Sequence, residues 1–472
     1  MAAPRISLCL IARDEAAFID SCLKHARSAV DEIVVLDTGS RDDTVARARR
    51  RGARVVCDTW RDDFADARNR ALAAATGDWV LVLDADEQLA LGSAKALRAF
   101  VRREDVDAGL IALHNAADAD ASHTDVLSGD RRRGAPTLLP RLFRRTPDLR
   151  WEGAIHETPQ TFALARASRF REVSGATIVH YGAVPSLVVA RGKAERNLRL
   201  LRARAEAEPD DPTPLAYIAG ELLTAGDVPG ADTAIEEAWV RTLARRAAGQ
   251  PGLGTLRVCV VRMHRASARG DHDAVLETAA LARASAILHP DIHFINGSTH
   301  ETLAGTASTP ALRDAELRAA LASYRAALAQ RGETLTLPYD AAVVGWLGHY
   351  CAGRVLVALG EPEAAIESFV ASAADAQDKP HPALFLAELA LDANEAALAE
   401  DLLAPWLDIP QPDAGALAAE AAIARSDVAT GLSRARAAAA RIKEGAKWVE
   451  GHRSERFSRV LRAGGAAPKG AR

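Results

Sequence analysis

The sequence predicts an α/β nucleotide-binding domain with a mostly parallel sheet, followed by an all-α domain of helical repeats. Two observations predict this order. Apolar segments that end in carboxylates alternate with helical patterns over residues 6–87, which is typical of a parallel nucleotide-binding sheet. From about Val184 onward, Ala, Leu, Glu and Arg recur at helical spacing instead, which predicts packed helices.

Four short apolar segments are the predicted strands: residues 6–11, 32–37, 53–57 and 79–83. Near-continuous apolar runs are typical of parallel strands that are buried on both faces. Between the first two segments, residues 15–29 carry apolar side chains at the spacing of an amphipathic helix. Because ligands of such sheets bind at the carboxyl ends of the strands, the polar residues after each strand are candidate site residues.

Two carboxylates, Asp84 and Asp86, directly follow the segment at 79–83. Hard oxygen ligands at a strand end suit a Mg²⁺ or Mn²⁺ ion that carries a phosphate group. The motif is short, however, and an alternative is that both residues only end a strand and cap the next helix. The surrounding pattern of strand-end carboxylates favours the metal site.

Three spaced segments, residues 32–44, 63–69 and 77–87, resemble glycosyltransferase family 2 in their sequence and order. This resemblance covers roughly residues 5–200 and implies a GT-A fold, a nucleotide-diphosphate sugar donor and inversion at the anomeric carbon. More narrowly, the chain resembles the branch with a tetratricopeptide-like C-terminal half, which includes bacterial core-oligosaccharide glucosyltransferases and peptide S-glycosyltransferases. One mild departure is Asp14, where many relatives carry Asn.

The resemblance also implies roles on the donor side of the site. Asp37 matches the carboxylate that accepts a hydrogen bond from a pyrimidine base, which implies a uridine nucleotide. Arg68 matches a cation that faces the diphosphate, as a guanidinium fork suits phosphate oxygens; the alternative is a solvated arginine on a helix face. Asp86 is the expected direct metal ligand, with Asp84 nearer the ribose or the metal-bound waters. The full set of nucleotide-sugar-binding residues implied in this way is Ile11, Arg13, Glu15, Asp37, Arg68, Asp84 and Asp86.

The acceptor side is expected in residues 151–157, which match the family pattern Trp/Tyr-Glu-Gly-x-Ile-His-Glu. An inverting transfer requires a base that takes the proton from the acceptor. Glu157 is the expected base, and His156 and Glu152 are the alternatives. His180, at the end of a β-rich segment, is a candidate metal ligand with Asp84 and Asp86, or a ligand of the diphosphate; the alternative is a structural histidine at a strand end.

Composition limits the classes of partner and compartment. A formal net charge of −4, without aromatic residues interleaved among the arginines, argues against nucleic-acid binding. No segment approaches the ~18–20 consecutive apolar residues that span a bilayer. The cysteines have no metal-binding spacing and are expected to be reduced core residues of a cytoplasmic protein. They are Cys9, Cys22, Cys57, Cys259 and Cys351.

The helical half shows recurrent helix–turn–helix breaks at residues 226–227, 270–271 and 360–361, with a weaker one at 392–394. The intervals are irregular, which predicts degenerate tetratricopeptide-like hairpins. An unrelated alanine-rich bundle is the alternative. The predicted domains are the glycosyltransferase domain at 1–183, the helical-repeat domain at 184–463 and a disordered tail at 464–472.

Together these observations predict a hexosyltransferase-like enzyme that moves a sugar from a UDP-sugar to a saccharide, peptide or protein acceptor with inversion and metal assistance. An extended repeat surface suits a long acceptor or the formation of a homo-oligomer. A sugar-phosphate nucleotidylyltransferase is disfavoured because residues 13–15 offer no glycine-rich phosphate loop. The other alternative is a non-catalytic interaction scaffold built on a degenerate glycosyltransferase domain.

Overall fold

The computed structural model divides the chain into two compact units: Met1–His289 with Gly332–Asp340, and Pro290–Arg331 with Ala341–Arg472. The expected tail at 464–472 lies outside the residues that the structure describes. The described residues are 3–184, 193–250, 252, 254–333, 335–375, 379–408, 412–443, 453, 457 and 458.

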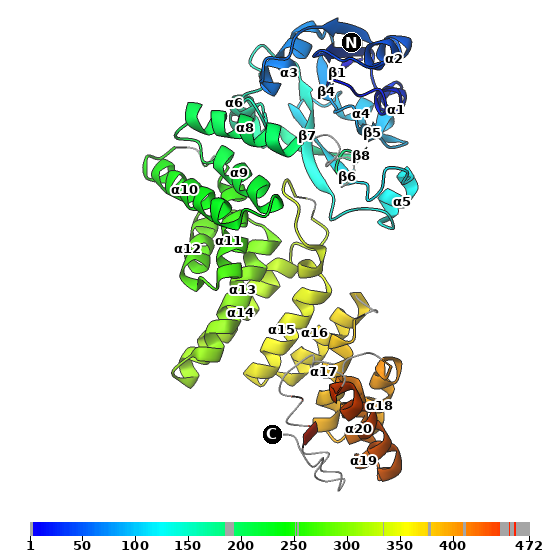
Figure 1. Ribbon diagram of the computed structural model, residues 1–472, viewed down its shortest axis with the longest axis vertical. Helices are drawn as coiled ribbons and strands as arrows, with labels where there is room; N and C mark the ends of the chain where they lie inside the picture. The colour runs from blue at the N-terminus through cyan, green and yellow to red at the C-terminus, as the bar shows by residue number, and fades with distance from the viewer. Residues whose placement is uncertain are drawn as a thin grey trace. The chain divides into compact units, whose positions relative to one another are not determined.

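An eight-stranded sheet forms the centre of the first unit (Figure 1), with the strand order β3-β2-β1-β4-β7-β6-β8-β5. The strands from β3 to β4 are parallel, as predicted, whereas β7 runs antiparallel to β4 and makes the sheet mixed. The strands are β1 (Ile6–Ala12), β2 (Glu32–Asp37), β3 (Arg54–Cys57), β4 (Trp79–Val82), β5 (Glu87–Leu89), β6 (Ala108–Asn115), β7 (Thr137–Arg144) and β8 (Phe170–His180).

The sheet is buried on both faces along β1, β2 and β4, which explains why these strands lack polar alternation. Leu8 and Leu10 of β1 pack in one core with Leu23 of α1. Cys9, on the opposite face, packs in a second core with Ala71 of α3. Six helices accompany the sheet: α1 (Ile19–Ala26), α2 (Thr44–Arg50), α3 (Phe64–Ala74), α4 (Ser93–Phe100), α5 (His123–Ser128) and α6 (Gln160–Arg166).

The prediction that every cysteine is a core residue is wrong for Cys57. Four of the five cysteines are buried and all five are free, but Cys57 is exposed. The reason is its place in the sheet, because Cys57 ends β3, the edge strand, where only one neighbouring strand is available to cover it.

Helices that follow the sheet in sequence belong to the same compact unit. They are α8 (Lys193–Ala207), α9 (Thr213–Thr224), α10 (Val228–Ala247), α11 (Thr255–Arg269) and α12 (His272–Ala284). The predicted turns lie between α9 and α10 and between α11 and α12, where Gly226 and Gly270 have φ values of +83° and +69°. These values lie in the left-handed region that glycine adopts without a steric cost. The segment Gly332–Asp340 also joins this unit, because the amide of Leu138 on β7 donates to the carbonyl of Leu335 at 2.8 Å.

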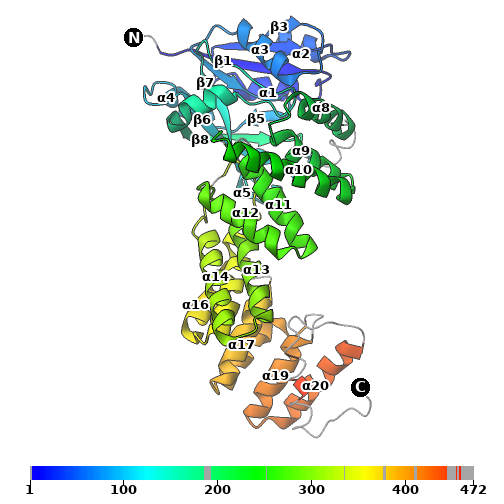
Figure 2. The ribbon, with the colours of Figure 1, turned by 90° about the vertical axis from the view of Figure 1, so that its left-hand side faces the viewer.

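The second unit consists of helices that pack mainly on their neighbours in sequence (Figure 2). Gly360 and Asn394, with φ values of +76° and +62°, form the predicted turns between α15 and α16 and between α17 and α18. At Gly353, a Cβ would lie 2.7 Å from the ring of Phe369, so a glycine allows α15 and α16 to approach closely. The helices are α13 (Pro290–Thr306), α14 (Pro310–Leu328), α15 (Trp346–Leu359), α16 (Pro362–Asp375), α17 (His381–Asp392), α18 (Ala396–Leu403), α19 (Asp413–Ala424) and α20 (Val428–Lys443).

A helix that crosses a bilayer must be long, about 20 residues, and predominantly apolar. Within the described ranges, no helix meets both requirements.

Candidate active site

The carboxyl end of β4 brings Asp86 and His180 together. The chain turns immediately after Asp86 into β5, which pairs antiparallel with β8 so that Glu87 lies opposite His180. Asp86 Oδ1 and His180 Nε2 are 3.6 Å apart, and Asp86 is only 5% exposed. His180 Nδ1 lies 2.8 Å from Asn115 Oδ1, at the end of β6. This contact orients the imidazole ring so that Nε2 faces Asp86.

Gly182 packs directly against these two side chains. A Cβ at this position would lie 2.1 Å from Asp86 Oδ2 and 2.7 Å from His180 Nε2. Any side chain at position 182 would therefore collide with one carboxylate oxygen and one imidazole nitrogen. Burial alone would lower the pKa of His180, but the carboxylates of Asp86, Glu87 and Asp84 outweigh burial and raise it. The surroundings of His180 thus favour a positive charge.

This donor set fits Mg²⁺ or Mn²⁺, which proteins hold with one or two side chains while substrate phosphates and waters supply the other ligands. The predicted ligands Asp86 and His180 lie side by side. The described part of the chain holds no group of three His, Cys, Asp or Glu residues arranged for a metal ion.

Asp84 instead faces two arginines. Its Oδ1 accepts a hydrogen bond from Arg68 Nη2 at 2.8 Å, and its Oδ2 lies 3.5 Å from Arg141 Nη2. Arg68 also donates from Nε to Glu157, and Arg141 donates to Glu87. Burial would raise the pKa of Asp84, but the two guanidinium groups hold it well below its usual range. The result is a continuous chain of alternating charges from the predicted base to the strand end.

Arg141 and Glu87 in this chain were not among the predicted site residues. Glu87 follows the Asp84–Asp86 motif directly, and Arg141 belongs to an arginine-rich run at 141–145, so both were visible in the sequence. Their contact depends on β7, which runs antiparallel beside β4. The sequence pattern did not predict that pairing.

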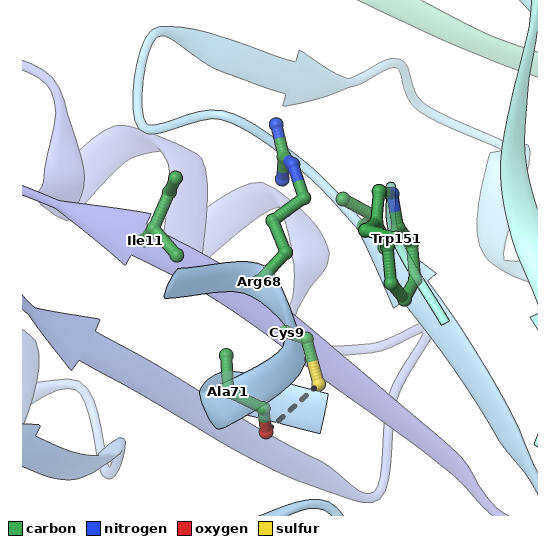
Figure 3. A pocket seen from close by; sticks show the side chains of 6 residues that line it. Cys9, Ile11, Arg68, Ala71 and Trp151 are labelled. Carbon is green, nitrogen blue, oxygen red and sulfur yellow. Dashed lines mark hydrogen bonds between the residues drawn. The ribbon is translucent and has the colours of Figure 1, made fainter. Parts of the chain in front are cut away.

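Arg68 extends from α3 over a small cavity (Figure 3). The cavity has a volume of about 10 Å³, enough for about one water molecule. The predicted nucleotide-binding residue Ile11 lines it, together with Cys9, Ala71, Val82 and Trp151. Ile11 therefore lies beside Arg68, and both side chains line the same cavity.

Asp37 ends β2 with an unused hydrogen-bond acceptor. Its Oδ2 accepts from the amides of Gly39 and Ser40 at 3.1 and 3.0 Å. Its Oδ1 is buried and has no hydrogen-bond partner among the described residues. Because a buried polar atom without a partner costs free energy, this oxygen fits a donor supplied by a ligand, such as the imide N–H of a pyrimidine base.

The predicted nucleotide loop at 13–15 is tied to the turn after β2. Asp14 has a φ of +55°, a conformation that Asp and Asn tolerate better than most residues, which explains why the departure from Asn is mild. Its Oδ1 accepts from the amide of Arg41 at 2.7 Å. The amide of Glu15 donates to Thr44 Oγ1 at 2.8 Å, and Arg13 is exposed.

The three candidate bases have different surroundings. Glu157 is the one that reaches Arg68, while Glu152 Oε1 accepts from the amide of Thr161 at 3.1 Å. The ring of His156 stacks on Tyr217 of α9 with a centroid separation of 3.6 Å. Burial, followed by the nearby charges of Arg257 and Arg204, lowers the pKa of His156 to about 3. Its imidazole is therefore neutral and weakly basic near pH 7.

Part of the chain matches a known protein family. Residues 7–174 match the model of the family described as glycosyl transferase family 2. A TPR repeat-containing protein of Synechococcus elongatus is 36% identical over 232 residues, which are 48% of this chain and 54% of that protein. Glycosyltransferase SunS of Bacillus phage SPbeta is 26% identical over 226 residues, or 46% of this chain and 49% of that protein. The chain spans about half the length of these curated relatives.

Among solved structures, a similar one is glucosyl-3-phosphoglycerate synthase from Mycobacterium tuberculosis in complex with Mn²⁺, UDP and glucosyl-3-phosphoglycerate. The two sequences are 31% identical over an alignment that covers 23% of this chain and 44% of the synthase, and the TM-score is 0.21. The family match and the α/β sheet followed by helices confirm the predicted fold class. The chain thus carries an N-terminal glycosyl transferase family 2 domain with a GT-A fold, followed by a region of helices.

Proposed function

We propose that the chain is a metal-assisted glycosyltransferase that moves a hexose from a UDP-sugar to a saccharide, peptide or protein acceptor with inversion. The observation that carries this proposal is that two separate groups of side chains lie at the carboxyl end of β4. Asp86 and His180 lie side by side against Gly182, while Arg68 joins Asp84 to Glu157. The first group suits a cation that carries a diphosphate, and the second contains Glu157, the carboxylate that we propose as the base.

On the donor side, the free Oδ1 of Asp37 would accept the imide N–H of uracil. Asp86 and His180 would hold Mg²⁺ or Mn²⁺, which when bound supplies positive charge to the diphosphate leaving group. Arg68 and Arg141 add two further cations at the same strand end. Their charge is balanced in this structure by Asp84, Glu87 and Glu157. Such fixed charges favour the transition state because they are already oriented when the leaving group becomes negative.

On the acceptor side, Glu157 would take the proton of the attacking group. Its Oε1 is bonded to Arg68, so Oε2 is the oxygen that would receive the proton. As the acceptor atom bonds to the anomeric carbon, the bond from that carbon to the diphosphate oxygen breaks on the opposite face. UDP leaves with the electron pair, and the sugar is inverted.

Release of UDP from a panel of UDP-sugars, measured with Mn²⁺, with Mg²⁺ and with excess EDTA, tests this proposal. We expect slow release with at least one donor and a metal, because water can replace the acceptor. An absence of release and of UDP binding with every donor would contradict the proposal and favour the non-catalytic scaffold. The variant Arg199→Gln, which alters an exposed ion pair with Asp62, serves as the active control.

A further inference from the structure

We propose that Arg204 on α8, Tyr217 on α9 and Arg257 on α11 are positioning residues that hold residues 152–158 in the geometry needed for Glu157 to act. This proposal rests on the proposed function of Glu157 as the base. All the residues involved belong to the first compact unit. The three helices follow the last strand of the sheet in sequence. Part of the proposed catalytic apparatus would therefore belong to the beginning of the helical region.

Arg204 binds the backbone of the loop directly. Its side chain is 5% exposed, and Nη1 donates to the carbonyl of Ile155 at 2.8 Å. Its other nitrogens bind Glu208 at 3.0 Å and Asp211 at 3.2 Å, so the guanidinium is fixed on its own side. A buried guanidinium with all these partners can hold only a narrow range of positions.

Gly153 makes this approach possible. It has a φ of +87°, and a Cβ would lie 2.5 Å from Arg204 Cζ. Both the conformation and the space exclude a side chain at this position. The glycine of the Trp-Glu-Gly pattern therefore has a structural explanation, because it lets an arginine from α8 reach the loop.

His156 is held by stacking. It has a φ of +51°, which is costly for a residue with a side chain, and such strain persists only where the surroundings impose it. Its ring lies nearly parallel to that of Tyr217, with an angle of 7° between the planes. Arg257 Cζ lies 4.0 Å from the centroid of the same Tyr217 ring. Imidazole, phenol and guanidinium thus form a stacked column that fixes the residue directly before Glu157.

The opposite side of the loop is fixed by α3, the helix that carries Arg68. Asn69 exchanges two hydrogen bonds with the backbone of Trp151, both at 2.9 Å. The amide of Phe64 donates to the carbonyl of Ala154 at 2.8 Å. The loop is consequently held between α3 and the helices α8, α9 and α11. Loss of the contacts with α8, α9 and α11 would free Glu157 to move relative to Arg68.

Substitutions in the full-length chain test this inference. Arg204→Gln removes the guanidinium, Tyr217→Ala removes the stacking surface, and Tyr217→Phe keeps the ring while removing the hydroxyl. Arg199→Gln is the matched control, because Arg199 lies on α8 but pairs with Asp62, and both side chains are more than half exposed. Exposed pairs of this kind contribute little to stability.

The rate of amide hydrogen exchange measures how often the loop opens, and it does not depend on enzymatic activity. The amides of Glu152 and Thr158 donate to each other's carbonyl at 3.0 and 3.1 Å, so their exchange reports opening of the loop. We expect at least about 10-fold faster exchange in Arg204→Gln and Tyr217→Ala, and near wild-type exchange in Tyr217→Phe and Arg199→Gln. Unchanged exchange in both Arg204→Gln and Tyr217→Ala would overturn the proposal.

Turnover of the UDP-sugar then separates positioning from direct contact. A displacement of about 1 Å can cost about 10²-fold in rate, so kcat should fall by up to this factor in the two disruptive variants, with the KM for the donor little changed. Tyr217→Phe should retain kcat. If Tyr217→Phe were as slow as Tyr217→Ala, the hydroxyl rather than the ring would matter and positioning by stacking would be rejected. Altered exchange in a protein that lacks any wild-type turnover would support the positioning and reject the proposed function alone.

Discussion

The two aspartates after β4 are separated by one residue in the sequence but have different partners. Asp86 lies next to His180, whereas Asp84 lies against Arg68 and Arg141. The difference follows from the chain path, because β5 begins directly after Asp86 and carries it to β8. The motif therefore places its two carboxylates in different surroundings, one beside an imidazole and one between two arginines.

Gly182 offers a direct test of the proposed metal ligands Asp86 and His180. We expect Gly182→Ala to weaken activation by Mn²⁺ by about 10–100-fold, because the new methyl group would displace the Asp86 carboxylate or the His180 ring. Titration of Mn²⁺ in the UDP-release assay measures this effect. Gly220→Ala is the control, since a Cβ there meets nothing within 4 Å. Equal Mn²⁺ dependence in both variants would contradict the proposed role of Asp86 and His180.

Glu157→Gln tests the base. We expect turnover to fall by roughly 10²–10⁴-fold, because the amide cannot accept the acceptor's proton, while calorimetry shows little change in UDP affinity. Glu152→Gln should lose far less, since Glu152 binds the amide of Thr161 and does not contact Arg68. A collapse of UDP affinity in Glu157→Gln would instead make Glu157 a donor-site residue.

At the scale of elements, Glu32 at the start of β2 joins several neighbours. Its carboxylate accepts from Ser7 Oγ of β1 at 2.6 Å, from the amide of Thr76 at 2.9 Å and from Arg54 of β3 at 3.0 Å. Burial would raise its pKa, but these bonds outweigh burial and lower the pKa of Glu32 to about 2. One carboxylate thus ties three strands and the turn before β4 together.

Acid unfolding tests this connection. Because the pKa of Glu32 is lower in the folded protein than its ordinary value of 4.5, the stabilisation is complete above that pH and is lost as the pH falls towards 2. We expect Glu32→Gln to lower the free energy of unfolding by roughly 2–3 kcal/mol at pH 7 and by much less at pH 3. Urea unfolding at both pH values measures the difference. A difference that stays constant with pH would contradict the role of the ionised carboxylate.

The sequence predicted the elements better than their pairing. The four parallel strands β1 to β4 and the carboxylates at their ends follow from buried apolar runs, which depend on local composition. The pairing of β7 with β4 and of β8 with β6 depends on contacts between distant segments, so the positions of Arg141 and Asn115 could not be predicted from local pattern. His180 was predicted from the family resemblance, and its neighbour Asn115 was not.

At the scale of the whole molecule, the chain forms two compact units, and the first contains both the sheet and the helices from α8 to α12. The helix turns at 226–227, 270–271, 360–361 and 392–394 were predicted correctly, because glycine and asparagine tolerate the left-handed conformations found there. The contacts of Arg204, Tyr217 and Arg257 with the loop at 152–158 could not be predicted, since nothing in a helical repeat pattern indicates which residues face another part of the chain.

Because the proposed donor site lies wholly in the first unit, UDP with Mn²⁺ should stabilise that unit alone. At a ligand concentration of about 100 times Kd, the expected stabilisation is about 2.7 kcal/mol. Scanning calorimetry should show one transition that moves to higher temperature and another that does not. Peptide-resolved hydrogen exchange would assign the shifted transition to the sheet. An equal shift of both transitions would contradict a donor site confined to the first unit.

We propose that Asp86 and His180 hold a divalent cation that carries the donor's diphosphate. Calorimetric binding of UDP to the full-length chain, in Mn²⁺ and in EDTA, tests this role when the wild type is compared with Asp86→Asn. Mn²⁺ should strengthen UDP binding by at least about 10-fold in the wild type and by far less in Asp86→Asn. Equal UDP affinity in Mn²⁺ and EDTA for the wild-type protein would contradict it.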